Sequence, residues 1–137
     1  EFLQALSKDP AKHHVLEPGM AYDPEGVFFI DYVADDDGWA HSMQVHPDGT
    51  ADYIAHNTDP LSHATRWISR TPDQDAIAIV EAGTAEPEGY HAEKEKGNVK
   101  ILAPGESVTM QLRIGSLPPD KAEAMEAHIQ DIIASAT

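Results

Sequence analysis

The sequence predicts a mainly β protein, an antiparallel β-sandwich of about six to eight strands with one C-terminal α-helix. Short runs of aromatic and β-branched residues alternate with Asp-Gly and Pro-Gly turns, a pattern typical of antiparallel strands. The segment Ser107–Ile114 is apolar at every second position, as in a strand with one buried face. Lys121–Ala134 carries its apolar residues on one helical stripe, and Pro119 and Asp120 suit its first turn. Strands buried on one face need a second layer, which favours a sandwich.

The composition is that of one acidic domain spanning residues 1–137. Its 24 acidic and 9 basic residues give a formal charge of −15, which argues against binding to nucleic acid or to anionic membranes. The chain has no cysteine, so disulfides and thiolate chemistry are excluded. No apolar run approaches the roughly 20 residues that a membrane-spanning helix needs. We therefore expect a cytoplasmic protein.

The N-terminal region is expected to hold little regular structure. Glu1–Lys8 fits a short helix or a turn, and Lys12–Asp23 reads as a polar loop broken by Pro-Gly. His13 and His14 lie in that loop. Adjacent side chains point in different directions on most backbones, so a plain loop is favoured there over a metal site.

The next three strands are expected to form an antiparallel meander. They are Val27–Val33, Trp39–His46 and Thr50–His56. The connecting turns contain Asp35–Gly38 and Pro47–Gly49, whose Asp and Gly residues tolerate tight backbone angles. The three adjacent acids of the first turn lack EF-hand spacing, so we interpret them as solvated hairpin residues rather than as a calcium site.

Three histidines fall on this meander: His41, His46 and His56. His41 and His46 differ by five positions, so along a regular strand they face opposite sides and do not share a metal ion. We predict no metal and no cofactor. His41 and His56 are candidate pocket residues, and purely structural roles are the alternative.

A tryptophan flanked by arginines follows in Leu61–Arg70. An indole ring such as that of Trp67 can stack on the apolar face of a sugar, and its N–H can donate a hydrogen bond. Arg66 or Arg70 can bind a carboxylate or phosphate in bidentate fashion. The alternative places Trp67 in the core and pairs both arginines with surface acids.

The stretch Asp75–Pro104 holds the candidate for acid–base chemistry. Ala76–Val80 reads as a buried strand that ends at Glu81, and a Gly/Pro-rich region then leads to a second strand, Val99–Leu102. A carboxylate at the end of a buried strand is expected to be partly desolvated, which raises its pKa and suits a general base. The alternative is a solvated strand-end residue.

Three motifs of this region occur in a familiar order: V-E-A-G-T-A-E-P-E-G-Y, then K-G-N-V, then L-A-P-G-E-S. In order and spacing they resemble the C-terminal part of the aldose 1-epimerase (galactose mutarotase-like) superfamily, closest to its divergent aldose-epimerase-like branch. The resemblance runs from about Leu16 to Leu117 and implies part of a two-sheet supersandwich. It also implies that Glu81 is the general base and that Trp67 lies near the sugar site.

Members of that superfamily are about twice as long as this chain, which starts with Glu1-Phe2 rather than with methionine. The resemblance thus implies a C-terminal fragment, and a short protein with a processed start is the alternative. A missing N-terminal portion or a second copy would then be a partner. The superfamily's acid histidine has no counterpart here, so the acid would come from the missing part or from His41 or His56.

Two function hypotheses follow, and both take a monosaccharide or a modified sugar as ligand. In the first, the protein is an isomerase that interconverts sugar anomers with Glu81 as general base. In the second, it is a non-catalytic carbohydrate-binding sandwich in which Trp67, Arg66 and Tyr90 contact the sugar. A metal enzyme built on the histidines ranks last because the His-x-His spacing of cupins is absent.

Overall fold

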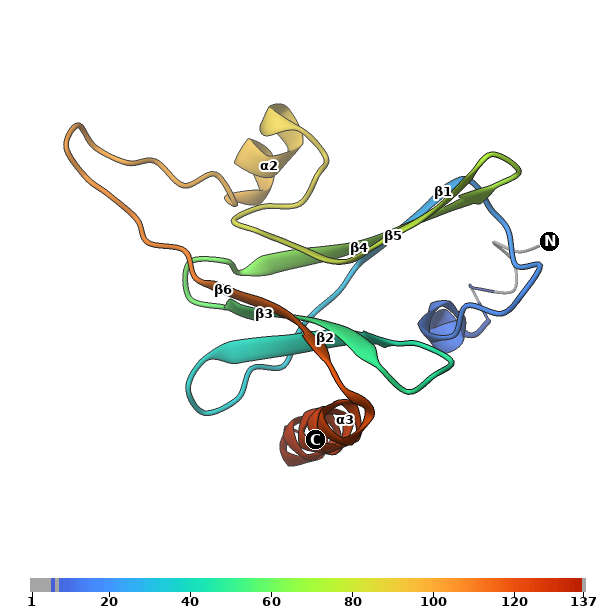
Figure 1. Cartoon of the computed structure of the whole chain (residues 1–137). Coiled ribbons are helices and arrows are strands. Elements are labelled where there is room, and N and C mark those ends of the chain that lie inside the picture. Colours follow the sequence, from blue (N-terminus) through green and yellow to red (C-terminus); the bar gives the residue numbers. More distant parts are fainter. Residues whose placement is uncertain (1–5, 7, 137) are drawn as a thin grey trace.

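The computed structural model describes residue 6 and residues 8–136, and Figure 1 shows their arrangement. The predicted helix or turn at Glu1–Lys8 therefore lies largely outside the described residues. The described elements, in chain order, are the 3-10 helix η1 (Pro10–His14), β1 (Tyr22–Phe29), β2 (Trp39–Val45), β3 (Ala51–Asn57), β4 (His63–Thr71), β5 (Gln74–Gly83), α2 (Tyr90–Lys96), β6 (Leu112–Leu117) and α3 (Pro119–Ser135).

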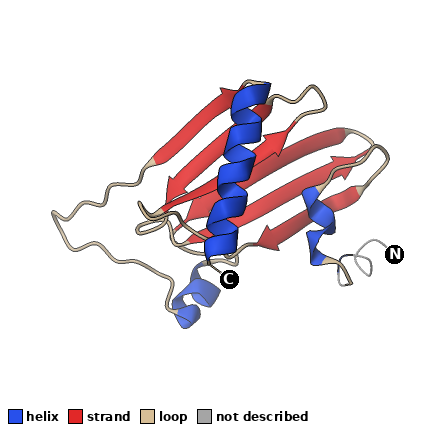
Figure 2. Cartoon of the chain, turned by 90° about the horizontal axis from the view of Figure 1, so that it is seen from below, coloured by secondary structure: helices blue, strands red, loops and turns tan. Residues whose placement is uncertain are grey.

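The strands form two antiparallel three-stranded sheets, with the orders β1-β4-β5 and β2-β3-β6. Figure 1 shows the sheets as two layers, with α3 on the side of the β2-β3-β6 sheet that faces away from the other sheet. In the view from below, α3 lies over that sheet and runs at an angle across its strands (Figure 2). The predicted mainly β architecture with a C-terminal helix is confirmed, while membership of the mutarotase-like superfamily stays a prediction.

The hairpin of β2 and β3 agrees closely with the prediction from the sequence. Its register runs from Trp39 opposite Asn57 to Val45 opposite Ala51. The turn closes where the His46 N–H donates to the Thr50 carbonyl at 2.8 Å. Gly49 in that turn has φ +85°, a left-handed backbone angle that favours glycine. The predicted Pro-Asp-Gly turn is therefore confirmed.

The first strand of the predicted meander is wrong in its bounds and in its partner. β1 ends at Phe29 and pairs with β4, so it belongs to the other sheet. The chain crosses between the layers after Ile30, whose N–H still bonds the Ala64 carbonyl of β4. By Asp35, the backbone N–H donates to the Trp39 carbonyl at the start of β2. An acidic turn between two apolar runs indicates a reversal but does not reveal a crossover between sheets.

Two further predictions in the second half of the chain are corrected. Val99–Leu102 is not a strand, and β6 begins at Leu112 rather than at Ser107. Instead, residues 97–111 form a long connection that projects from the sheets in Figure 1. Alternating apolar residues predict an extended backbone, but an extended backbone becomes a strand only where a neighbouring strand accepts its hydrogen bonds.

Two helices complete the described chain. The short helix α2 follows the Gly/Pro-rich region after β5, and it is capped at its C-terminal end by Gly97, which has φ +81°. The helix α3 confirms the predicted C-terminal helix, and its Ala122 is buried against the body. Neither described helix is long and apolar enough to cross a membrane.

Alanine is the most frequent of the buried apolar residues in the described chain. Ala40, Ala51 and Ala55 are fully buried on β2 and β3, and Ile68 is the largest fully buried apolar side chain. In contrast, several large apolar side chains lie exposed on the 97–111 connection and on β6, up to 86% for Ile101. The apolar surface that this chain buries is thus concentrated between its two sheets and beneath α3.

Candidate functional site

A groove of about 900 Å³ lies along the free edge of β2. This size lies within the usual range for small-molecule sites. Its walls come from six separate parts of the chain, which meet only in the fold. They are residues 13–16, the crossover residues 30–33, residues 41–47 of β2 and its turn, Arg66 of β4, Ile77 and Ile79 of β5, and Glu126, Ile129, Gln130, Ile132 and Ile133 of α3.

Arg66 on β4 contributes its positive charge to the wall of this groove. Its Nε donates to the Ile79 carbonyl at 3.3 Å, and its Nη1 lies 3.3 Å from His13 Nδ1. His13 stacks on Phe28 with the ring centres 4.2 Å apart. Burial, together with the positive charge of Arg66, lowers the pKa of His13 to about 4. His13 is therefore a neutral imidazole at pH 7 and accepts a hydrogen bond from Arg66.

Two polar side chains of the groove wall have unmet hydrogen-bonding capacity. Among the described residues, no partner lies within reach of the buried hydroxyl oxygens of Tyr32 and Ser42. A buried hydroxyl without a partner costs about 1–3 kcal/mol. The serine hydroxyl can turn toward a bound molecule by rotation about one side-chain bond, so Ser42 is the better placed of the two to gain a partner from a ligand.

His41 lines the groove and is held on both sides. Its Nδ1 lies 2.7 Å from the Tyr53 hydroxyl, and its Nε2 lies 2.9 Å from Asp35 Oδ2. Partial burial opposes ionisation of Asp35, but hydrogen bonds from His41 and from the backbone N–H groups of Trp39 and Asp37 outweigh it and lower the pKa of Asp35. The prediction that the acids of this turn are solvated therefore holds for the exposed Asp37. It is wrong for Asp35, which is half-buried and bonded to His41.

The structure places His56 in the core, and it is not among the residues that line the groove. Its side chain is 1% exposed and meets the edge of the Tyr32 ring at a centroid distance of 5.4 Å. Burial, and after it the charge of His41, lowers the pKa of His56. Of the two predicted pocket histidines, only His41 lines the groove. In the register His56 is opposite Ala40, so it lies on the face of the sheet opposite to that of His41.

Trp67 and Glu81 lie on the other face of the β1-β4-β5 sheet, away from the groove. In the register, Trp67 is opposite Ala78 and Glu81 is opposite Thr65, two positions along β4. The indole N–H of Trp67 donates to the Glu25 carboxylate. The expected desolvation of Glu81 is wrong, because its side chain is exposed on the outer face of β5. The apolar run before it predicted a strand but not the direction of its last side chain.

Tyr90 lies on α2, where 62% of its surface is exposed. It is not among the residues of the groove. Beside it, Lys96 contacts three carboxylates, those of Glu86, Glu88 and Glu93. Glu93 is buried and accepts hydrogen bonds from the Glu86 N–H and the Asn98 side chain, each at 2.8 Å.

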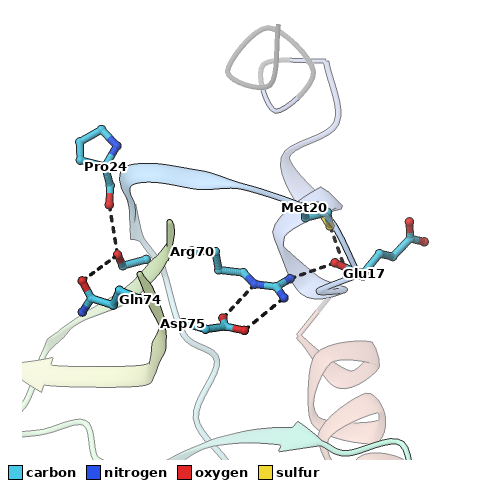
Figure 3. A network of polar contacts seen from close by, with 7 residues as sticks. Glu17, Met20, Pro24, Arg70, Gln74 and Asp75 are labelled. Atoms are coloured by element: carbon cyan, nitrogen blue, oxygen red, sulfur yellow. Dashed lines mark hydrogen bonds and ion pairs between the residues drawn. The ribbon is translucent and has the colours of Figure 1, made fainter. Parts of the chain in front are cut away.

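Arg70, the alternative anion-binding arginine, is engaged in a structural network (Figure 3). Its Nε lies 2.9 Å from Asp75 Oδ1, and its Nη1 donates to the Glu17 carbonyl at 2.9 Å. Next to it, the Ser69 hydroxyl donates to the Pro24 carbonyl at 3.1 Å. The network ties β4, β5 and the segment before β1 together, so Arg66 is the arginine that remains directed at the groove.

The fold thus unites Arg66 and His41 and separates them from Trp67, Glu81, Tyr90 and His56. Sequence reasoning missed His13, Tyr32 and Ser42. Each belongs to a segment interpreted as a loop or a strand, and the groove they line is formed by residues distant from them in sequence. A short local pattern carries no signal for such contacts.

Comparisons with protein-family models, with curated proteins and with solved structures found no match for this chain.

Proposed function

We propose that this chain is a carbohydrate-binding β-sandwich that holds a monosaccharide or a modified sugar in the groove along β2. The observation that supports this most is the mixed lining of a groove of about 900 Å³, which includes both hydrogen-bonding and aliphatic side chains. A sugar ring presents hydroxyl groups around its rim and C–H groups on its faces, so it needs both kinds of neighbour.

Arg66 is the proposed anchor. A guanidinium donates in a fixed fork, which matches two adjacent hydroxyls or one carboxylate. Ser42 and Gln44 on the β2 wall would bond further hydroxyls, and the Ser42 hydroxyl would gain the partner it lacks among the described residues. Ile77 and Ile79 on β5 would contact the C–H face of the ring.

Anomer exchange fits this groove less well than binding does. The isomerase hypothesis needs a base and an acid on one sugar. Glu81 lies on the outer face, whereas His41 lines the groove and His56 lies in the core. A sugar held in the groove would therefore not meet Glu81, and the isomerase stays a separate prediction that requires a sugar on the outer face.

Calorimetric titration with glucose, galactose and glucuronate tests the proposal. We expect Arg66→Gln to weaken binding at least tenfold, about 1.4 kcal/mol, with the largest loss for the carboxylate sugar. The matched controls Glu81→Gln and Trp67→Phe remove the two outer-face candidates and should change the Kd less than twofold. Circular dichroism checks that each variant is folded.

Two results would overturn the proposal. One is that none of the three sugars binds the wild-type chain. The other is that binding survives Arg66→Gln and is lost in Glu81→Gln, which would move the site to the outer face.

A further inference from the structure

A second polar cluster joins three separate parts of the chain. Asp35 precedes β2, His41 lies within β2, and His128 lies on α3. One potential ligand atom from each of the three side chains lies within 4.8 Å of the other two. The His41 and His128 rings meet edge to face at a centroid distance of 5.3 Å. The helix thus brings a second imidazole to a histidine and an aspartate that are already bonded to each other.

The spacing of the first two groups suits metal coordination. His41 Nε2 and Asp35 Oδ2 are 2.9 Å apart. Two ligands bound to one tetrahedral zinc ion at about 2.1 Å are separated by about 3.4 Å. The pair would therefore move apart by only about 0.5 Å to accept an ion, while His128, on the exposed surface of the helix, would adjust its rotamer.

The groups behind these ligands fix their orientation. Asp35 Oδ1 accepts from the backbone N–H groups of Asp37 at 3.0 Å and of Trp39 at 2.8 Å, which leaves Oδ2 to face His41. On the far side of the His41 ring, Nδ1 meets the Tyr53 hydroxyl at 2.7 Å. A metal-binding histidine usually has its second nitrogen bonded in this way, because that bond fixes the tautomer and the ring plane.

Two other groups of potential metal ligands in the described chain lack features of this cluster. His46 and Asp52 form a pair at the same 2.9 Å, but both side chains are well exposed, and among the described residues no third metal-ligating group completes a set with them. The cluster Glu86, Glu88 and Glu93 already surrounds the ammonium group of Lys96. Of these three groupings in the described chain, only the Asp35 cluster combines a preoriented, sheltered pair with a third ligand and no bound ammonium group.

We propose that Asp35, His41 and His128 bind a divalent transition-metal ion such as Zn²⁺. Two imidazoles and one carboxylate favour first-row transition metals over Mg²⁺ and Ca²⁺, which prefer oxygen ligands throughout. Three protein ligands leave a fourth position of a tetrahedral ion to water or another small ligand. The ion would link α3 to β2. The metal site does not depend on sugar binding, although His41 belongs to both sites.

The test uses the whole chain, freed of metal with a chelator and titrated with Zn²⁺ alone and with Co²⁺ alone. We expect one equivalent of Zn²⁺ to bind and Co²⁺ to give a ligand-field spectrum of a nitrogen- and oxygen-bound ion. His128→Gln should weaken Zn²⁺ binding at least tenfold. Since His128 is exposed, this variant should unfold at the same temperature as the metal-free wild type.

His46→Gln is the matched control, because it removes a histidine just after the same strand that is paired with an aspartate at the same distance. It should bind Zn²⁺ as the wild type does. The proposal is overturned if the wild type takes up no Zn²⁺, if the two variants bind Zn²⁺ equally well, or if excess Ca²⁺ displaces it. The last result would indicate diffuse attraction to an acidic surface.

Discussion

The two faces of the β1-β4-β5 sheet differ in how they are covered. On the inner face, Arg66 lies against His13, which stacks on Phe28, and both Arg66 and His13 line the groove. On the outer face, Trp67 bonds the exposed Glu25, and Glu81 is exposed to solvent. Arg66 and Trp67 are consecutive residues, and the alternation of a strand sends them to opposite sides of one sheet.

This difference favours the more enclosed inner face over the outer face as the place of a binding site. Burial together with a neighbouring cation brings the pKa of His13 to about 4. The carboxylate of Glu81 lacks the burial on which its proposed role depended. A site assembled from Trp67, Arg66 and Glu81 would have to exist on both faces at once.

The largest difference between the two faces is expected in the free energy of unfolding that is lost when an apolar side chain is shortened. Ile68 is fully buried, whereas 46% of Val27 on the outer face is exposed. Ile68→Ala should lower the free energy of unfolding by about 3 kcal/mol, because it removes buried methyl groups and leaves a cavity. Val27→Ala should lower it by less than about 1 kcal/mol. Guanidinium denaturation measures both, and equal losses would contradict this difference between the faces.

His13 should make stability depend on pH. Its pKa is about 4 in the folded chain, against the ordinary value of 6.5 that the unburied side chain has. Between these values the unfolded chain binds a proton that the folded chain does not, so stability falls as pH drops from about 6.5 to 4. We expect a loss of about 2 kcal/mol, less than the full shift would give, because the groove is open to water.

Urea denaturation across this pH range, compared between wild type and His13→Gln, isolates the contribution of His13. The variant should lose less stability on acidification, although Arg66 then has a different neighbour. His91→Gln, which changes an exposed histidine on α2, is the control and should follow the wild-type profile. A His13→Gln profile that coincides with that of the wild type would show that burial of His13 is not linked to its protonation.

The smallest effect is expected for the hydrogen bond of the outer face. Glu25→Ala removes the acceptor of the Trp67 indole N–H, yet water can replace it because the contact is exposed. The free energy of unfolding should fall by roughly 0.5 kcal/mol. Denaturation followed by tryptophan fluorescence measures this, with Glu81→Ala as a nearby control. A loss above about 2 kcal/mol would mean that the outer face is as organised as the inner one.

Much of the fold could be predicted from local patterns. The β2–β3 hairpin follows from its Pro-Asp-Gly turn, and α3 follows from an apolar stripe behind two prolines. Predictions failed where partners decide the outcome. β1 pairs with β4 rather than with the next strand along the chain. Residues 97–111 form no strand, because no neighbouring strand of the described chain pairs with them.

The site was only partly predictable for the same reason. Arg66 and His41 were selected by residue type, and the fold brings both to the groove. Their neighbours could not be foreseen, because His13 reaches Arg66 and His128 reaches His41 across long separations in sequence. The role given to Glu81 came from its place at the end of an apolar strand and from motif order, and neither determines the exposure of its side chain.

The most direct test of the groove proposal is to map amide chemical shifts of the ¹⁵N-labelled chain during titration with glucuronate. The proposal predicts that shifts concentrate on His13, Ser42, Gln44, Arg66 and Ile79, and that the amides of Glu25, Trp67 and Glu81 move little. Shifts confined to the outer-face residues would contradict the proposal and would favour a site built around Glu81.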